Sequence, residues 1–123
     1  MMVDTGVVDN ILLDLLKHEE ILGAVAVSID GLVVGSAGIN QTDAELAGAL
    51  GASLVGAAER TARRLGAGLA SDVSIGTADG FIHVKSGGDF AVLVFSEMSD
   101  GVTVKKACGV AVDEISKMLE GLE

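Results

Sequence analysis

The sequence has 123 residues, half of them hydrophobic, with one cysteine, no proline, no tyrosine and no tryptophan. A chain of this length can bury about two thirds of its unfolded surface in one core, so we expect a single domain over residues 1–123. The formal net charge is −10, and basic residues do not alternate with aromatic ones. Because such a surface repels phosphates, the composition argues against nucleic acid as a partner.

Neither a membrane span nor a secretory leader is predicted. The longest stretch without a charge, residues 46–58, has 13 residues, whereas a spanning helix needs roughly 18 apolar residues. No lysine or arginine precedes the first apolar run, which argues against a signal peptide. The only cysteine cannot form an internal disulfide and fits a reducing compartment. We therefore expect a cytoplasmic protein without membrane insertion.

The chain begins with a predicted amphipathic helix and a hairpin. The helix runs from Asp4 to about Glu20, and its apolar residues recur at helical spacing. They are Val8, Ile11, Leu12, Leu15 and Leu16. Residues 21–29 and 32–37 are predicted strands, joined by a two-residue turn at Asp30-Gly31.

A long second helix is predicted from Thr42 to about Leu65. Thr42 and Glu45 have the spacing of a capping box, and Gly66 and Gly68 are typical of a helix end. One broad side of this helix is apolar and is expected to form the side that faces the sheet together with its two shoulders. Its residues are Leu46, Ala47, Leu50, Leu54, Val55, Ala57, Ala58 and Ala62.

Three further strands and a last helix complete the chain. The strands are predicted at residues 70–77, 81–86 and 90–95, and the helix runs from Asp100 to Leu122. The first and fifth strands are apolar on both faces, as central strands are, and the third has the alternation of an edge strand. The order α-β-β-α-β-β-β-α predicts an α+β fold, an α/β/α sandwich around a five-stranded antiparallel sheet.

A row of small side chains on the second helix predicts self-association. The row is Ala49, Ala52, Ser53 and Gly56, with Glu45, Glu59, Arg60 and Arg63 beside it. If two copies crossed antiparallel near Ser53, Ala49 would face Gly56, and Glu45 would face Arg60. This self-complementarity is typical of a two-fold homodimer. The alternative is an ordinary solvated helix face.

The glycines inside this helix support close packing between the second helices of two copies. A glycine costs about 0.5 to 1 kcal/mol relative to alanine in a helix interior, so Gly48, Gly51 and Gly56 need a packing reason. Close contact between two such helices is the reason that we expect.

No catalytic, cofactor or metal site is predicted. Gly66-Ala-Gly68 follows a helix and precedes a strand, the reverse of a dinucleotide-binding loop. His18 and His83 have no ligand-type neighbour at metal spacing, and we expect both at the surface. Cys108 is expected to be a buried, inert thiol on the stripe that also contains Val104, Ala111, Ile115 and Leu119. The residues argue against an enzyme and favour a protein that acts by contact.

The chain resembles the Roadblock/dynein light chain domain family. The likeness is carried by residues 23–36, by the alanine-rich segment 46–54 and by the strand pair over residues 81–95. It implies a profilin-like or longin-like sandwich and a homodimer joined by second helices and third strands. On the third strand the implied interface residues are Val73, Ser74, Ile75 and Gly76.

The resemblance also implies a partner. Prokaryotic members, including bacterial regulators of gliding motility and polarity, act with small Ras-like GTPases as activators or scaffolds. Two alternatives remain open: a dimeric scaffold without GTPase regulation and, less favoured, a small-molecule sensor. The resemblance implies that such activators reorganise the catalytic loops of the GTPase and do not insert an arginine finger. For Arg60, Arg63 and Arg64, a dimer ion pair or a solvated helix end is therefore favoured over a finger role.

Overall fold

The computed structural model describes residues 5–99 and 101–121. In these residues the chain forms three helices and five strands in the predicted order. They are α1 (Thr5–Leu15), β1 (Ile21–Ser28), β2 (Val33–Ala37), α2 (Gln41–Arg64), β3 (Asp72–Gly76), β4 (Gly80–Ser86), β5 (Phe90–Glu97) and α3 (Val102–Gly121). Three predicted helix bounds, Asp4, Asp100 and Leu122, lie outside the described residues.

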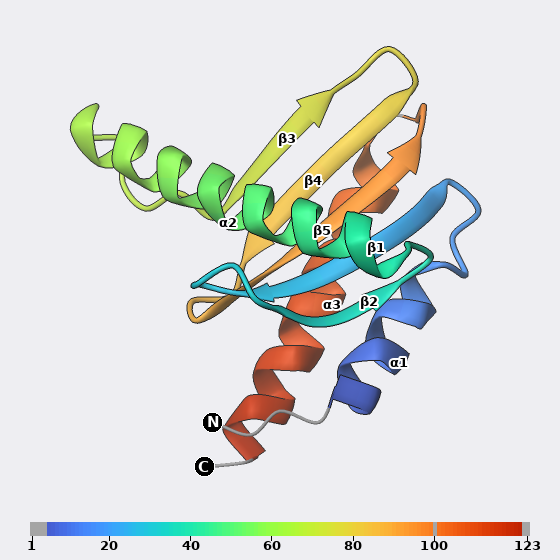
Figure 1. Ribbon diagram of the computed structural model, residues 1–123. Coiled ribbons are helices and arrows are strands. Elements are labelled where there is room, and N and C mark those ends of the chain that lie inside the picture. The colour runs from blue at the N-terminus through green and yellow to red at the C-terminus, as the bar shows by residue number, and fades with distance from the viewer. Residues whose placement is uncertain (1–4, 100, 122–123) are drawn as a thin grey trace.

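The strands form one antiparallel sheet in the order β2-β1-β5-β4-β3. Helix α2 crosses one face of the sheet, and α1 and α3 cover the other (Figure 1). The predicted α+β sandwich is therefore confirmed, with β5 at the centre, β1 beside it and β3 at an edge. No helix in the described part of the chain is both long and apolar enough to cross a membrane.

The two faces of the sheet have cores of different size. Under α1 and α3, sixteen buried apolar residues form one cluster, among them Leu12, Val92 and Ile115. Under α2 the buried cluster, within the described residues, has four members: Val27, Val84, Ala91 and Leu93. Since area removed from water stabilises a fold, most of the packing energy lies on the α1/α3 face. The α2 face is thinly covered.

Helix α2 is rotated relative to the sequence prediction. Its buried residues are Ala44, Gly48 and Gly51, so Gly48 and Gly51 pack on the chain's own sheet and not on a second helix. Leu46 and Leu50, predicted to face the sheet, are 62% and 55% exposed. Of the residues predicted on the sheet side, Ala47, Leu54 and Val55 do pack against the smaller core. The prediction was wrong for Leu46 and Leu50 because it placed the largest side chains inward, whereas glycines permit the closest contact between helix and strand.

The ends of the helices differ from the predictions in two places. The N-cap of helix α2 is Asn40, two residues before the Thr42 that the capping-box pattern indicated, because the Asn40 side chain accepts a hydrogen bond from the Asp43 N–H at 2.8 Å. Helix α1 ends at Leu15, since the next N–H groups donate to carbonyls three residues back and tighten the chain into turns. The predicted end of α2 is confirmed, with Gly66 at a φ of 67°.

The β1–β2 connection is also longer than predicted. The pairing of Val27 with Val33 leaves residues 28–32 outside the regular ladder, and the Ser28 N–H donates to the Leu32 carbonyl at 2.8 Å. Gly31, with a φ of 89°, supplies the left-handed residue of this loop.

Candidate protein-interaction surfaces

One edge of the sheet is closed by the protein's own helix. Asp9 of α1 accepts a hydrogen bond from the Ser36 N–H of β2, at 2.9 Å. Val8 lies so close to Gly35 that a side chain at that position would overlap it. A helix and a carboxylate placed over a strand edge are a common protection against pairing with another chain.

The opposite edge, β3, is open. The Ser86 N–H donates to the Ser71 carbonyl at 3.0 Å, and the Thr77 N–H donates to the Gly80 carbonyl at 2.9 Å. Because hydrogen-bonded positions alternate in an antiparallel pair, the backbone groups of residues 72, 74 and 76 point away from β4. Within the described residues no other strand pairs with β3.

The side chains of the predicted interface strand divide between the two faces. Val73 and Ile75 are half-buried and pair with Val84 and Ile82, which lie under α2. Ser74 points to the opposite face, where it contacts His83. The prediction of an edge strand is thus confirmed, while its role as an interface stays a prediction.

An apolar groove runs along the same side of α2 as β3. Its volume is about 710 Å³, and its apolar residues come from α2, from the sheet and from the β2–α2 connection. They are Leu22, Ile39, Leu46, Ala47, Leu50, Leu54, Ile75, Phe81, Ile82, Leu93 and Phe95. Two carboxylates, Asp43 and Asp79, also line it. The sequence prediction missed this groove because it placed Leu46 and Leu50 inside the core.

The C-terminal end of α2 extends past the edge of the sheet (Figure 1). It is basic, with Arg63 and Arg64 in its last turn. Two solvent-exposed leucines follow the helix: Leu65 is 75% exposed, and Leu69 is fully exposed. Large apolar side chains gathered beside an open edge are typical of a contact surface.

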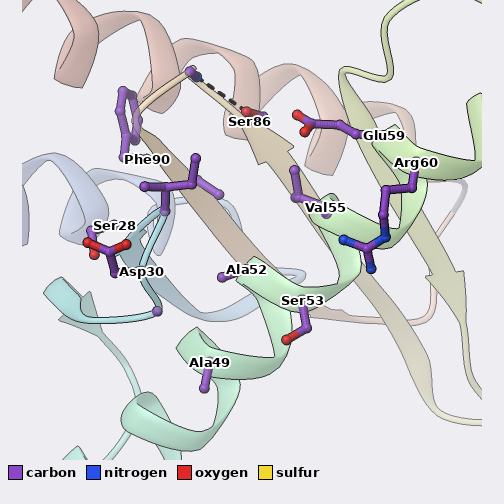
Figure 2. Close-up of a pocket in the computed structure, with 15 residues that line it drawn as sticks. Ser28, Asp30, Ala49, Ala52, Ser53, Val55, Glu59, Arg60, Ser86 and Phe90 are labelled. Carbon is purple, nitrogen blue, oxygen red and sulfur yellow. Dashed lines mark hydrogen bonds between the residues drawn. The ribbon is translucent and has the colours of Figure 1, made fainter. Parts of the chain in front are cut away.

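The predicted row of small residues lies on the other side of α2. Ala49, Ala52, Ser53, Gly56 and Arg60 all line a cleft of about 480 Å³ between α2 and the β1–β2 hairpin. Figure 2 shows Ser28 and Asp30 across this hairpin cleft from Ala52 and Ser53. Glu45 is exposed and hydrogen-bonds the Gln41 amide at 3.1 Å; it lies outside the cleft.

Gly56 has a local role in this row. A Cβ there would lie 3.3 Å from Nη1 of Arg60 and near no other group outside its own helix. The guanidinium therefore folds back over the glycine, where an alanine would crowd it. In the described residues Arg60 forms no ion pair.

His83 is buried, which corrects the predicted surface position. It is 2% exposed, and its Nδ1 lies 2.7 Å from Ser74 Oγ. Its Nε2 lies 3.4 Å from a carboxylate oxygen of Asp72. Burial lowers the pKa of His83, with Lys105 and Lys85 acting in the same direction and Asp72 opposing them.

Serine, histidine and aspartate in contact can also serve nucleophilic catalysis. Ser74 and Asp72 both come from the open strand, and none of the three residues lines the hairpin cleft or the apolar groove. In this structure the contacts connect β3 to β4. The alternation of polar residues in β3 was the only signal in the sequence, since the partner of Ser74 depends on strand register.

The positions of Cys108 and His18 agree with the predictions. Cys108 is buried, and burial raises its pKa to about 12. His18 is exposed in the turn after α1. Among the described residues no three histidine, cysteine or carboxylate side chains are grouped so that they could hold a metal ion.

Comparison with known proteins identifies relatives over most of the chain. The family model of the Roadblock/LC7 domain matches residues 7–97. An uncharacterized protein of Methanocaldococcus jannaschii is 37% identical over 90 residues, which are 73% of this chain and 79% of the relative. Another from the same organism is 34% identical over 107 residues, 83% of this chain and 91% of the relative.

Solved structures show the same fold at lower identity. A Roadblock/LC7 domain from Streptomyces avermitilis superposes with a TM-score of 0.86 at 21% identity, covering 91% of this chain and 97% of that one. MglB of Myxococcus xanthus has a TM-score of 0.86 at 21% identity, covering 100% and 96%. The gliding protein MglB of Thermus thermophilus has a TM-score of 0.80 at 16% identity, covering 98% and 94%.

Proposed function

The chain belongs to the Roadblock/LC7 domain family, and from this membership we propose that it is a homodimeric regulatory module, one domain over residues 1–123, that binds a small Ras-like GTPase in the cytoplasm. The fold neighbours named MglB support a regulatory role. The main support for the dimer is that one edge of the sheet is closed and the other is open. Helix α2, with exposed leucines, lies beside the open edge.

In the proposed dimer, the two β3 strands pair across a two-fold axis. The groups free for pairing belong to residues 72, 74 and 76. An antiparallel register centred on Ser74 places Asp72 opposite Gly76 of the second copy, so free donors and acceptors meet. Because α1 closes the other edge, the pairing stops at two copies and does not continue into a filament.

The second part of the interface is the exposed side of α2. A two-fold axis through β3 brings helix α2 of each copy over the sheet of the other. The apolar groove then receives the C-terminal end of the partner's helix, with Leu65 and Leu69 as its apolar side chains. Burying a leucine stabilises a contact by about 1.5 to 3 kcal/mol, and Leu46 and Leu50 contribute from the receiving side.

Charge favours this orientation. The groove has Asp43 and Asp79 among its lining residues, whereas the entering end of the helix carries Arg63 and Arg64. Antiparallel helices bring these opposite charges together twice, once for each copy. Complementary charges mainly fix register and accelerate association.

The row of small residues offers a second register for the same pair of helices. In that register Ala49 meets Gly56 of the second copy, and Glu45 meets Arg60. We favour the groove register because it covers Leu46 and Leu50, while Ala52 and Gly56 are half-buried beside the hairpin cleft. Different substitutions are expected to disrupt the two registers.

The oligomeric state tests the dimer. We expect Leu50→Asp to weaken self-association by at least about tenfold, because it places a carboxylate in the groove, with the dissociation constant measured by analytical ultracentrifugation. Leu13→Asp is the matched control, since Leu13 is 51% exposed on α1. If Gly56→Leu dissociates the dimer and Leu50→Asp does not, the row of small residues is the interface. A monomeric wild-type protein would overturn both registers.

A direct assay tests the GTPase partner. Small GTPases from the same organism, loaded with GTP or GDP, are mixed with the purified protein, and complex formation and GTP hydrolysis are followed. We expect a complex and a changed hydrolysis rate. A complex with unchanged hydrolysis would favour the scaffold role. No complex with any of these GTPases would overturn the proposed partner and leave the dimer untouched.

A further inference from the structure

The buried histidine of β4 contacts two residues of the open edge strand, β3. His83 of β4 reaches both Ser74, at 2.7 Å, and Asp72, at 3.4 Å. These two residues also present unpaired backbone groups at the edge of the sheet. Any change at His83 therefore acts on two of the three positions that β3 offers for pairing.

The surroundings of His83 disfavour a positive charge. The imidazole is 2% exposed and lies opposite Val94 of β5. The charged groups near it are Lys85 of β4, Lys105 of α3 and the carboxylate of Asp72. Burial and the two lysines disfavour the protonated ring, and Asp72 favours it. The Asp72 side chain is 39% exposed at the strand edge, so solvent screens its attraction.

The neutral ring satisfies both contacts. With the proton on Nε2, the ring donates toward Asp72 and its Nδ1 accepts from the Ser74 hydroxyl. Protonation puts a charge in a site with little water. The charge gains solvent when β3, whose Ser74 and Asp72 contact the ring, moves away. An uncovered edge strand of five residues opens at low cost.

We propose that His83 is a proton-sensitive latch that holds β3 in the sheet near neutral pH and releases it on acidification, so that the edge used for pairing is lost. The consequence for assembly rests on the proposed dimer. The release itself is a property of one copy of the chain.

The direction of the pH effect depends on whether the closed or the opened state binds the proton more tightly. In the closed sheet, burial keeps the pKa of His83 below its ordinary value, whereas in the opened state the ring regains a value of about 6.5. The open state therefore takes up the proton first. Closure is fully favourable above about pH 6.5, and it weakens by up to about tenfold for each pH unit below that value.

Two measurements test the latch. Amide hydrogen exchange, corrected for intrinsic rates, gives the protection of the Val73 and Ile75 amides, which the alternation of the ladder turns toward β4, between about pH 7.5 and pH 5. We expect protection there to fall as the pH drops below 6.5, by at most about tenfold per unit and only until the pH reaches the lowered pKa of His83 in the closed sheet, while β1 and β5 stay protected. The dimer dissociation constant, measured over the same range, should rise in parallel.

The matched variants are His83→Gln, which has no titrating ring, and His18→Gln, which removes the exposed histidine. We expect His18→Gln to follow the wild type and His83→Gln to lose the pH dependence. Equal pH dependence in all three proteins would overturn the latch. Should His83→Gln not fold, the ring signal of His83 in the wild type decides: titration near pH 6.5 with β3 still protected overturns the proposal.

Failure of the dimer and failure of the latch are distinguishable. If the wild-type protein is monomeric at every pH, the proposed dimer is wrong. Selective loss of protection in β3, absent from His83→Gln, would still support the latch in that monomer.

Discussion

Gly48 of α2 packs tightly against Val27 of β1: a Cβ at Gly48 would be 3.2 Å from Cγ2 of Val27, closer than side-chain carbons normally pack. One turn along the helix, a Cβ at Gly51 would be 3.2 Å from Leu93. These two glycines set the distance between α2 and the sheet. Leu46 and Leu50 are thereby left on the outer side of the helix.

A large side chain at Gly48 should therefore lift the helix from the sheet. We expect Gly48→Leu to lower the free energy of unfolding by about 1 to 3 kcal/mol through overpacking, measured by urea denaturation at fixed protein concentration. Gly56→Ala is the contrast, because only the flexible tip of Arg60 is near. It should raise stability by about 0.5 to 1 kcal/mol. Equal effects of the two changes would contradict this account of the helix.

The closed edge of the sheet gives a second prediction. Asp9→Ala removes the acceptor of the Ser36 N–H, and hydrogen bonds to charged groups are worth about 1.5 to 3 kcal/mol. We expect a comparable loss of unfolding free energy, together with species larger than a dimer in light scattering, because the β2 edge is uncovered.

Asp14→Ala is the control for this change. Asp14 is exposed on the same helix and pairs only with exposed Lys17 in a surface ion pair, worth about 0 to 1 kcal/mol. Its loss should leave both stability and size nearly unchanged. If Asp9→Ala behaves like Asp14→Ala, the carboxylate does not protect the edge.

The order of elements could be predicted because each one carries its own local signal. The apolar period of α1, the uninterrupted apolar runs of β1 and β5 and the glycine after α2 are all short-range patterns. The place of β3 at the edge followed from its polar alternation. These features need no knowledge of which segment packs on which.

The rotation of α2 and the burial of His83 could not be predicted in this way. An apolar face that includes both leucines and small residues does not reveal which half meets the sheet, and only the packing of Gly48 on Val27 decides it. His83 is buried because strand register places it beside Ser74 and Asp72. Both features depend on contacts between segments far apart in the chain.

Gly80 gives a third prediction. Gly80 is the first residue of β4, and a Cβ there would overlap the backbone carbonyl of Ser96 in β5. Backbone cannot move aside as a flexible side chain can. We expect Gly80→Ala to lower the free energy of unfolding by more than about 2 kcal/mol, measured by thermal and urea denaturation.

The control is Gly121→Ala at the end of α3. Among the residues that the structure describes, no atom outside its own helix lies within 4 Å of the added carbon, so this substitution should leave stability the same or slightly higher. A small effect at both positions would show that β4 and β5 can separate enough to admit the methyl group.

The last prediction concerns the thiol of Cys108. It is buried in the larger core, its Sγ lies 3.6 Å from the Val92 carbonyl oxygen, and burial raises its pKa to about 12. Only the thiolate reacts with disulfide reagents or alkylating agents. At about pH 8 an ordinary cysteine is partly ionised, whereas this one stays protonated and out of reach.

We therefore expect labelling of Cys108 in the native protein only when the α1/α3 face opens. Its rate should rise with urea in parallel with global unfolding and should be unaffected by Leu50→Asp on the opposite face of the sheet. A rate near that of the unfolded chain in the absence of denaturant would contradict the burial of the thiol. The same experiment tests whether the larger core survives the loss of the proposed dimer, because α1 and α3 pack on the chain's own sheet.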